Sequence, residues 1–123
     1  MDVLVADDDS VMALMLSSCL KKAGHNVVVA RDAMQTMMAA MRKPPDAILL
    51  DVMMPGGNGL QVLRQLKTSV KTALIPIIVI TGSVDPATVP TATELGADRC
   101  MAKPPDLNRL LSTLQELVPC ARN

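Results

Sequence analysis

Carboxylate, hydroxyl and ammonium side chains follow short apolar runs at four places in this sequence. They are Asp7, Asp8, Asp9, Asp51, Thr81 and Lys103. Clustered carboxylates raise one another's pKa unless a cation offsets their charge. A hard divalent ion such as Mg²⁺ suits this set, because it prefers oxygen ligands and typically takes one or two protein carboxylates. The pattern therefore predicts an acidic, metal-dependent site.

The same side chains form a set suited to phosphoryl transfer. Asp51 is predicted to be the nucleophile, because carboxylates form aspartyl phosphates in some ATPases. Lys103 would place a compact positive charge on the phosphoryl oxygens, and Thr81 would offer them one hydroxyl donor. Each residue taken alone is a common turn or surface residue. The prediction depends on four strand ends that supply complementary groups.

Short apolar runs alternate with helical patterns along the chain. The strand-like runs are Val3–Ala6, Val27–Ala30, Ala47–Leu50, Ile77–Ile80 and roughly Arg99–Ala102. Five repeats of strand then helix predict an α/β fold with a parallel sheet and helices on both faces. The runs are continuous rather than alternating, which is typical of strands buried on both sides. Ligands of such sheets bind beyond the carboxyl ends of the strands, so the candidate site residues are expected at one edge.

Five helical patterns follow these runs. Their apolar stripes lie within 12–20, 34–41, 60–66, 91–95 and 107–117. We expect the four methionines within 34–41 to pack into the core, since methionine is an adaptable packer. Ala13 and Leu14 lie off the first stripe. We interpret them either as a contact with a partner protein or as ordinary scattered apolar residues. Arg31 and Asp32 are interpreted as a solvated turn and a helix cap.

Composition limits the class of protein. The chain has 123 residues, no net charge at pH 7 and no Phe, Tyr or Trp, so no nucleic-acid surface is expected. No apolar run approaches the roughly 18 residues of a membrane span. The opening MDVLVADDDS is unlike a signal peptide, and three widely spaced cysteines predict neither a disulfide framework nor a zinc site. We expect a cytoplasmic protein with no direct contact to nucleic acid or membrane.

Four motifs together resemble the receiver domain of response regulators in two-component signalling. They are VLVADDDS, ILLDVMMPGGNG, IIVITGS and MAKPP, and the resemblance runs from about Val3 to Val118. It implies a five-stranded, parallel, doubly wound sheet of the flavodoxin-like type, with strand order 2-1-3-4-5 and five helices. It also implies that residues 1–123 form a single receiver domain.

The resemblance implies a role for each site residue. The ligands of Mg²⁺ would be Asp7, Asp8, Asp51 and the backbone carbonyl of Met53. Asp51 would accept a phosphoryl group from a histidine kinase or a phosphotransfer histidine, which would switch a surface that binds an effector protein. Thr81 would be the switch hydroxyl, and Lys103 would precede a cis peptide bond to Pro104. The domain would not be an enzyme, because it would catalyse only its own phosphorylation and dephosphorylation.

One position departs from the family pattern, and a second can affect hydrolysis of the phosphoryl group. Receivers usually carry an aromatic residue three positions before the lysine, where this chain has Cys100. We expect activation to move the Thr81 loop but to reach the face of the fourth helix differently or weakly. Met53 lies two residues after Asp51 and cannot orient a water molecule. This favours a long-lived phosphoryl group; alternatively, Met53 only covers the pocket.

Two other functions fit parts of the sequence. The run Asp7–Ser10 contains the DxD pattern of haloacid-dehalogenase phosphatases, in which Asp7 would be the nucleophile. The short chain, the lack of a cap and of a late acidic pair, and the otherwise unexplained Asp51 argue against it. The other alternative is a degenerate receiver that acts as a binding module, favoured only by Cys100. The resemblance is compatible both with a receiver that stands alone and with one that belongs to a longer regulator or hybrid kinase.

Overall fold

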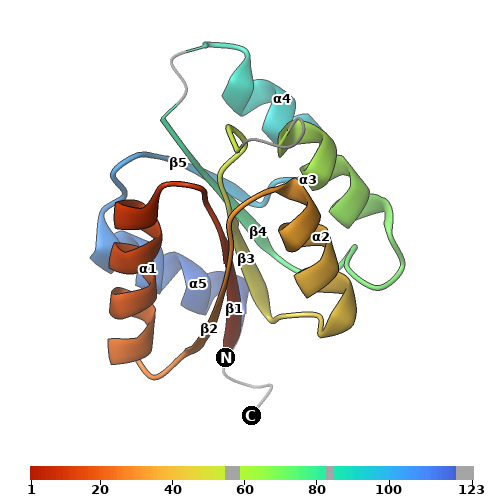
Figure 1. Cartoon of the computed structure of the whole chain (residues 1–123). Coiled ribbons are helices and arrows are strands. Elements are labelled where there is room, and N and C mark those ends of the chain that lie inside the picture. The colour runs from red at the N-terminus through yellow and green to blue at the C-terminus, as the bar shows by residue number, and fades with distance from the viewer. Residues whose placement is uncertain (55–58, 83–84, 119–123) are drawn as a thin grey trace.

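The computed structural model describes residues 1–54, 59–82 and 85–118, in which five strands alternate with five helices (Figure 1). The strands are β1 (Asp2–Ala6), β2 (Asn26–Ala30), β3 (Ala47–Leu50), β4 (Ile77–Thr81) and β5 (Arg99–Ala102). The helices are α1 (Ser10–Lys22), α2 (Ala33–Arg42), α3 (Gly59–Thr68), α4 (Thr88–Glu94) and α5 (Leu107–Leu117). Residues 55–58 of the motif around Asp51 lie outside the described residues. Within the described residues, none of the helices has the length and apolar character needed to cross a membrane.

The strands form one parallel sheet in the order β2-β1-β3-β4-β5. This confirms the predicted doubly wound, flavodoxin-like topology with five helices. The strand bounds lie close to the expected runs: β1 and β2 each begin one residue earlier, and β4 extends to Thr81. Helix α4 begins at Thr88 rather than near Thr91. Pro90 lies in its first turn, where the missing N–H removes no helical hydrogen bond.

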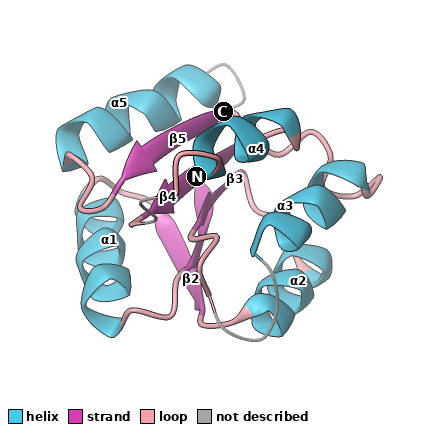
Figure 2. Cartoon of the chain, turned by 90° about the horizontal axis from the view of Figure 1, so that it is seen from above, coloured by secondary structure: helices cyan, strands magenta, loops and turns pink. Residues whose placement is uncertain are grey.

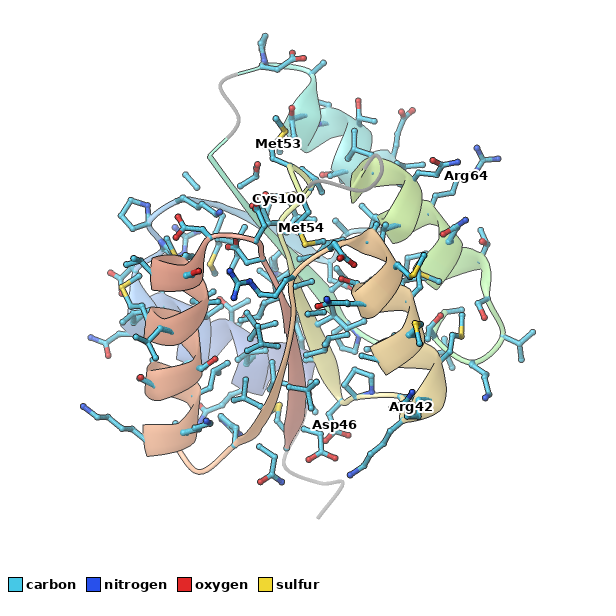
Figure 3. The ribbon with its side chains drawn as sticks, viewed as in Figure 1. Arg42, Asp46, Met53, Met54, Arg64 and Cys100 are labelled. Atoms are coloured by element: carbon cyan, nitrogen blue, oxygen red, sulfur yellow. The ribbon has the colours of Figure 1, made fainter. Side chains whose placement is uncertain are left out.

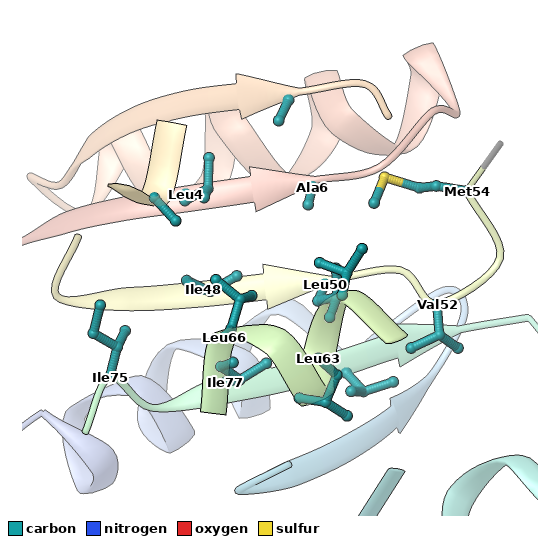
Figure 4. Close-up of a cluster of buried hydrophobic side chains, with 14 of the residues drawn as sticks. Leu4, Ala6, Ile48, Leu50, Val52, Met54, Leu63, Leu66, Ile75 and Ile77 are labelled. Atoms are coloured by element: carbon teal, nitrogen blue, oxygen red, sulfur yellow. The ribbon is translucent and has the colours of Figure 1, made fainter. Parts of the chain in front are cut away.

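Helices cover both faces of the sheet. Figure 2 shows α1 and α5 on one face and α2, α3 and α4 on the other. On the second face, Leu63 and Leu66 of α3 belong to one cluster with Ile48 and Leu50 of β3, and all four are completely buried (Figure 4). Burying a leucine or isoleucine side chain contributes about 1.5–3 kcal/mol. Aliphatic side chains therefore build this core without any aromatic residue.

The prediction that the methionines of α2 pack into the core is wrong for Met34 and Met38, whereas Met37 is half-buried and packs against the core. Met34 and Met38 are 72 % and 54 % exposed, whereas Thr36 and Ala40 are fully buried. Thr36 can be buried because its hydroxyl donates a hydrogen bond to the carbonyl of Asp32, at 2.7 Å. The small side chains let α2 pack closely on the sheet, and the helical spacing of the methionines fits the outer face equally well.

Two further expectations about burial are wrong. Ala13 is buried on the inner face of α1, in line with Leu16 and Leu20, while Leu14 is 68 % exposed. Strand β2 is apolar but lies at the edge of the sheet, where Val28 is 57 % exposed. An apolar run therefore identifies a strand without showing how many neighbours cover it.

Candidate functional site

The carboxyl ends of β1 and β3 bring two acids together. These strands are neighbours, with Ala6 opposite Leu50, and Asp7 and Asp51 are the next residues. The backbone N–H of Asp51 donates to the carbonyl of Ala6 at 2.9 Å, and the N–H of Asp7 donates to the carbonyl of Ala30 at 3.0 Å. The strand pairing thus continues to the acids themselves and fixes their backbones at this edge of the sheet.

Three carboxylates converge at this edge. Each of Asp7, Asp8 and Asp51 offers an oxygen atom, and these atoms lie within 4.8 Å of one another. Asp7 and Asp51 are only 2 % and 4 % exposed, whereas Asp8 is exposed. The N–H of Asp9 donates to Asp7 Oδ1 and that of Met53 to Asp51 Oδ1, each at 2.9 Å. This set of oxygen donors fits a hard divalent cation.

The ammonium group of Lys103 lies between the two buried carboxylates. Its Nζ is 2.8 Å from Asp51 Oδ2, and 3.0 and 3.2 Å from the oxygens of Asp7. Burial by itself lowers the pKa of Lys103, but the carboxylates of Asp51 and Asp7 outweigh it and raise the pKa overall. Lys103 therefore stays charged and offsets the repulsion between the acids.

The pKa of Asp7 shows that a buried carboxylate is unfavourable at this edge of the sheet. Burial raises its pKa, the N–H of Asp9 and the ammonium of Lys103 lower it, and the charge of Asp51 raises it again. The net shift of the Asp7 pKa is upward. A charged Asp7 is therefore less favourable than a solvated aspartate, and a bound cation would favour its charged form.

Thr81 and Lys103 reach the same edge through β4 and β5. Thr81 lies opposite Ala102, and the N–H of Lys103 donates to the carbonyl of Thr81 at 3.1 Å. The Lys103–Pro104 peptide bond is cis, as predicted. An open pocket of about 390 Å³ lies over the acids, lined by Asp8, Asp9, Asp51, Met53, Gly82 and Lys103. Thr81 is 5 % exposed and is not among the residues that line the pocket, whereas the next residue, Gly82, is.

The sequence profile of the response regulator receiver domain matches residues 3–115. The chain belongs to this family. The receiver is 32 % identical to protein PilH of Pseudomonas aeruginosa, over 94 % of the chain and 96 % of that protein. It is 35 % identical to the sensory/regulatory protein RpfC of Xanthomonas campestris, over 99 % of the chain but only 17 % of that protein. The chain thus spans about a sixth of this longer relative.

Solved structures of similar proteins have the same fold. The chemotaxis response regulator CheY4 of Vibrio cholerae matches with a TM-score of 0.86 and 28 % identity, over 94 % of this chain and 97 % of that chain. The receiver domain of a signal-transduction histidine kinase from Syntrophus aciditrophicus matches with a TM-score of 0.87 and 29 % identity, over 95 % and 89 %. The protein is therefore a receiver domain of two-component signalling, and the phosphatase alternative is not favoured.

Arg31 supports the acidic loop of the receiver, which the sequence interpretation as a solvated turn missed. Its Nη2 donates to the carbonyl of Asp8 at 3.0 Å and to Ser10 Oγ at 2.6 Å. Asp9 caps α1 and accepts hydrogen bonds from two backbone N–H groups of the first turn. These contacts orient the loop that carries Asp7 and Asp8. The one sequence signal for this contact is that Arg31 directly follows β2, the strand next to β1, which carries the acidic loop.

Cys100 lies beside the core in the receiver (Figure 3). It is half-buried on β5, opposite Val79, and Thr93 on α4 lies close enough to influence its thiol. Burial raises the pKa of the Cys100 thiol, and the Thr93 side chain partly opposes this shift. The expectation that activation reaches α4 differently or weakly stays a prediction.

Gly59, the first residue of α3, is the second residue of the site that sequence reasoning missed. A Cβ at position 59 would overlap the backbone of Val52, the residue that follows Asp51. We therefore expect Gly59→Ala to lower the free energy of unfolding by about 1–3 kcal/mol, because the Asp51 segment must move away. Urea denaturation measures this loss.

Gly82→Ala is the matched control for this substitution. A Cβ at position 82 would meet only the side chain of Lys103, at 3.9 Å, which is an ordinary contact. Its free energy of unfolding should stay within about 0.5 kcal/mol of the wild type. Equal effects of the two substitutions would contradict the close approach of Gly59 to Val52.

Proposed function

We propose that Asp51 is the phosphoacceptor of this receiver. Among the three clustered acids, Asp51 is the one that is both buried and part of the pocket lining, since Asp8 is exposed and Asp7 is not among the lining residues. The observation that carries the proposal is the ammonium of Lys103, 2.8 Å from the Asp51 carboxylate. A cation at this distance can hold a phosphoryl group against the acid as the bond forms.

The phosphoryl group would come from the imidazole of a phosphorylated histidine. A carboxylate oxygen of Asp51 attacks the phosphorus, the bond from phosphorus to the imidazole nitrogen breaks, and its electron pair leaves with the imidazole. Lys103 balances the charge of the phosphoryl oxygens, and the hydroxyl of Thr81 donates to one of them. The product is an aspartyl phosphate, and the reaction is self-catalysed rather than that of a turnover enzyme.

Mg²⁺ would be held by Asp7, Asp8, Asp51 and the backbone carbonyl of Met53. The convergence of three carboxylates within 4.8 Å supports this ligand set. When bound, the ion would neutralise charge on the transferred phosphoryl group. The upward shift of the Asp7 pKa is the shift that a cation would reverse.

The partners follow from this chemistry. The phosphodonor is a histidine kinase or a phosphotransfer histidine protein, and the phosphorylated form binds an effector protein. Residues 1–123 act as a single receiver domain in the cytoplasm, with no direct contact to nucleic acid or membrane. A chain with no net charge and no aromatic residue supports the lack of a nucleic-acid surface.

Treatment with acetyl phosphate and Mg²⁺ tests the phosphoacceptor proposal. We expect the intact mass to increase by one phosphoryl group, peptide mapping to place it on Asp51, and a chelator to prevent the modification. Modification of Asp7 would instead support the phosphatase-like alternative. No modification in the presence of Mg²⁺ would overturn the proposal and favour a degenerate receiver.

The phosphoryl group on Asp51 is expected to be long-lived. Met53 lines the pocket and is 62 % exposed, and its thioether cannot orient a water molecule for attack. Met53→Gln supplies an amide at the same position and should speed hydrolysis several-fold, as a time-course of the phosphorylated mass would show. Met38→Gln, a similarly exposed methionine on α2, should leave the decay unchanged. Rapid wild-type decay, or equal decay of all three proteins, would contradict a role for Met53.

A further inference from the structure

A second cavity lies between α2 and the edge strand β2. Its volume is about 340 Å³, within the range of small-molecule sites. It is lined by Asp2, Val3, Leu4, Asn26, Val28, Ala39, Arg42, Lys43 and Pro45. Asp2 and Asn26 begin their strands, so the cavity reaches the amino ends of the strands and the acidic site occupies the opposite edge.

The cavity exists because α2 covers β2 incompletely. Leu4 on β1 is buried, whereas its neighbour in the sheet, Val28, is 57 % exposed on the same face. Ala39 presents only a methyl group from the helix. Val28, Ala39 and Pro45 thus form an apolar lining that is open to solvent beside the buried Leu4, and an apolar ligand would remove this lining from water.

The charged residues around the cavity differ in whether they have polar partners. Asp2 is engaged by Lys43, at 3.9 Å, and by the side-chain amide of Asn26, at 3.0 Å. Asp46 accepts a hydrogen bond from the N–H of Asp2, at 2.7 Å, and so is also engaged at the start of β1. Arg42 lies at the end of α2 (Figure 3). It makes no ion pair with any described residue. The rim therefore offers the guanidinium of Arg42, which has no counterion within residues 1–54, 59–82 and 85–118.

We propose that this cavity binds a small aliphatic carboxylate. The aliphatic body would lie against Leu4, Val28 and Ala39, and the carboxylate would pair with the guanidinium of Arg42. A guanidinium binds a carboxylate through two parallel hydrogen bonds, which gives geometric as well as electrostatic selectivity. The proposal concerns the opposite edge of the sheet from Asp51 and does not depend on the phosphoacceptor role.

Titration of the isotope-labelled full chain with octanoate, followed by NMR, tests the inference. We expect saturable shifts of backbone amides in β2 and at the end of α2, with a dissociation constant of about 1 mM or lower. Octanamide has the same aliphatic body without the charge and should bind at least about tenfold more weakly. Shifts that do not saturate, or equal binding of both probes, would overturn the proposal.

Three variants locate the site. Arg42→Gln should weaken octanoate binding at least about tenfold, whereas Arg64→Gln, an exposed arginine on α3, should leave it unchanged (Figure 3). Val28→Phe should abolish binding, because the ring would fill the cavity from an already exposed position. Octanoate binding that is insensitive to Arg42→Gln and Val28→Phe would overturn the assignment of this cavity.

Discussion

Replacing Asp51 with asparagine is expected to reduce phosphorylation by acetyl phosphate and Mg²⁺ below detection. The neutral amide cannot attack phosphorus as a carboxylate does. The fold should persist, because the asparagine oxygen can still accept the N–H of Met53 and Lys103 keeps its contact with Asp7, at 3.0 Å. Intact mass measures the phosphorylation, and urea denaturation of the same sample measures the fold.

Asp9→Asn is the matched control for this substitution. It makes the same change from carboxylate to amide in a residue that also lines the pocket. Asp9 caps α1 by accepting from the N–H groups of Val11 and Met12, at 3.0 and 3.2 Å, and asparagine caps helices equally well. Phosphorylation of Asp9→Asn should equal that of the wild type. Loss of phosphorylation in Asp9→Asn but not in Asp51→Asn would instead identify Asp9 as the second acid of a DxD phosphatase.

The parallel α/β fold could be predicted because β3 and β4 are short, uninterrupted aliphatic runs between helical patterns. Their residues are all buried, as continuous apolar runs predict. The strand order came from the motifs, since the spacing of runs alone does not say which strands are neighbours. The exposure of Val28 could not be predicted, because β2 resembles a central strand in composition. The exposure of Met34 and Met38 on α2 could not be predicted either, since a helical period does not show which face is buried.

The candidate site could be predicted where one rule sufficed. Parallel strands end at the same edge, so Asp7, Asp51 and Lys103 had to approach one another once the runs were recognised as strands. Arg31 and Gly59 act through contacts with backbone that no local pattern encodes. The guanidinium of Arg31 binds a carbonyl 23 residues away in the sequence, and Gly59 is required by the path of the chain after Asp51.

Replacing Lys103 with methionine is expected to lower the free energy of unfolding by about 3 kcal/mol when divalent cations are absent. Methionine keeps the apolar stem but removes the charge. The carboxylates of Asp7 and Asp51, 2 % and 4 % exposed, would then face each other without the ammonium that now lies 3.0 and 2.8 Å away. Urea denaturation in the presence of a chelator measures the loss.

Added Mg²⁺ should restore more stability to Lys103→Met than to the wild type. A ligand that binds only the folded state stabilises it by RT ln(1 + [L]/Kd), so tighter binding gives more stabilisation at the same ion concentration. The variant should bind Mg²⁺ more tightly, because it no longer has an ammonium group competing for the carboxylates. Lys71→Met, an exposed lysine that donates to the carbonyl of Met41 at 3.2 Å, should change stability by less than about 0.5 kcal/mol with or without the ion. Equal stabilisation of wild type and Lys103→Met by Mg²⁺ would mean that Lys103 and the cation do not share these carboxylates. The ammonium would then balance Asp7 and Asp51 without occupying the position that the cation needs.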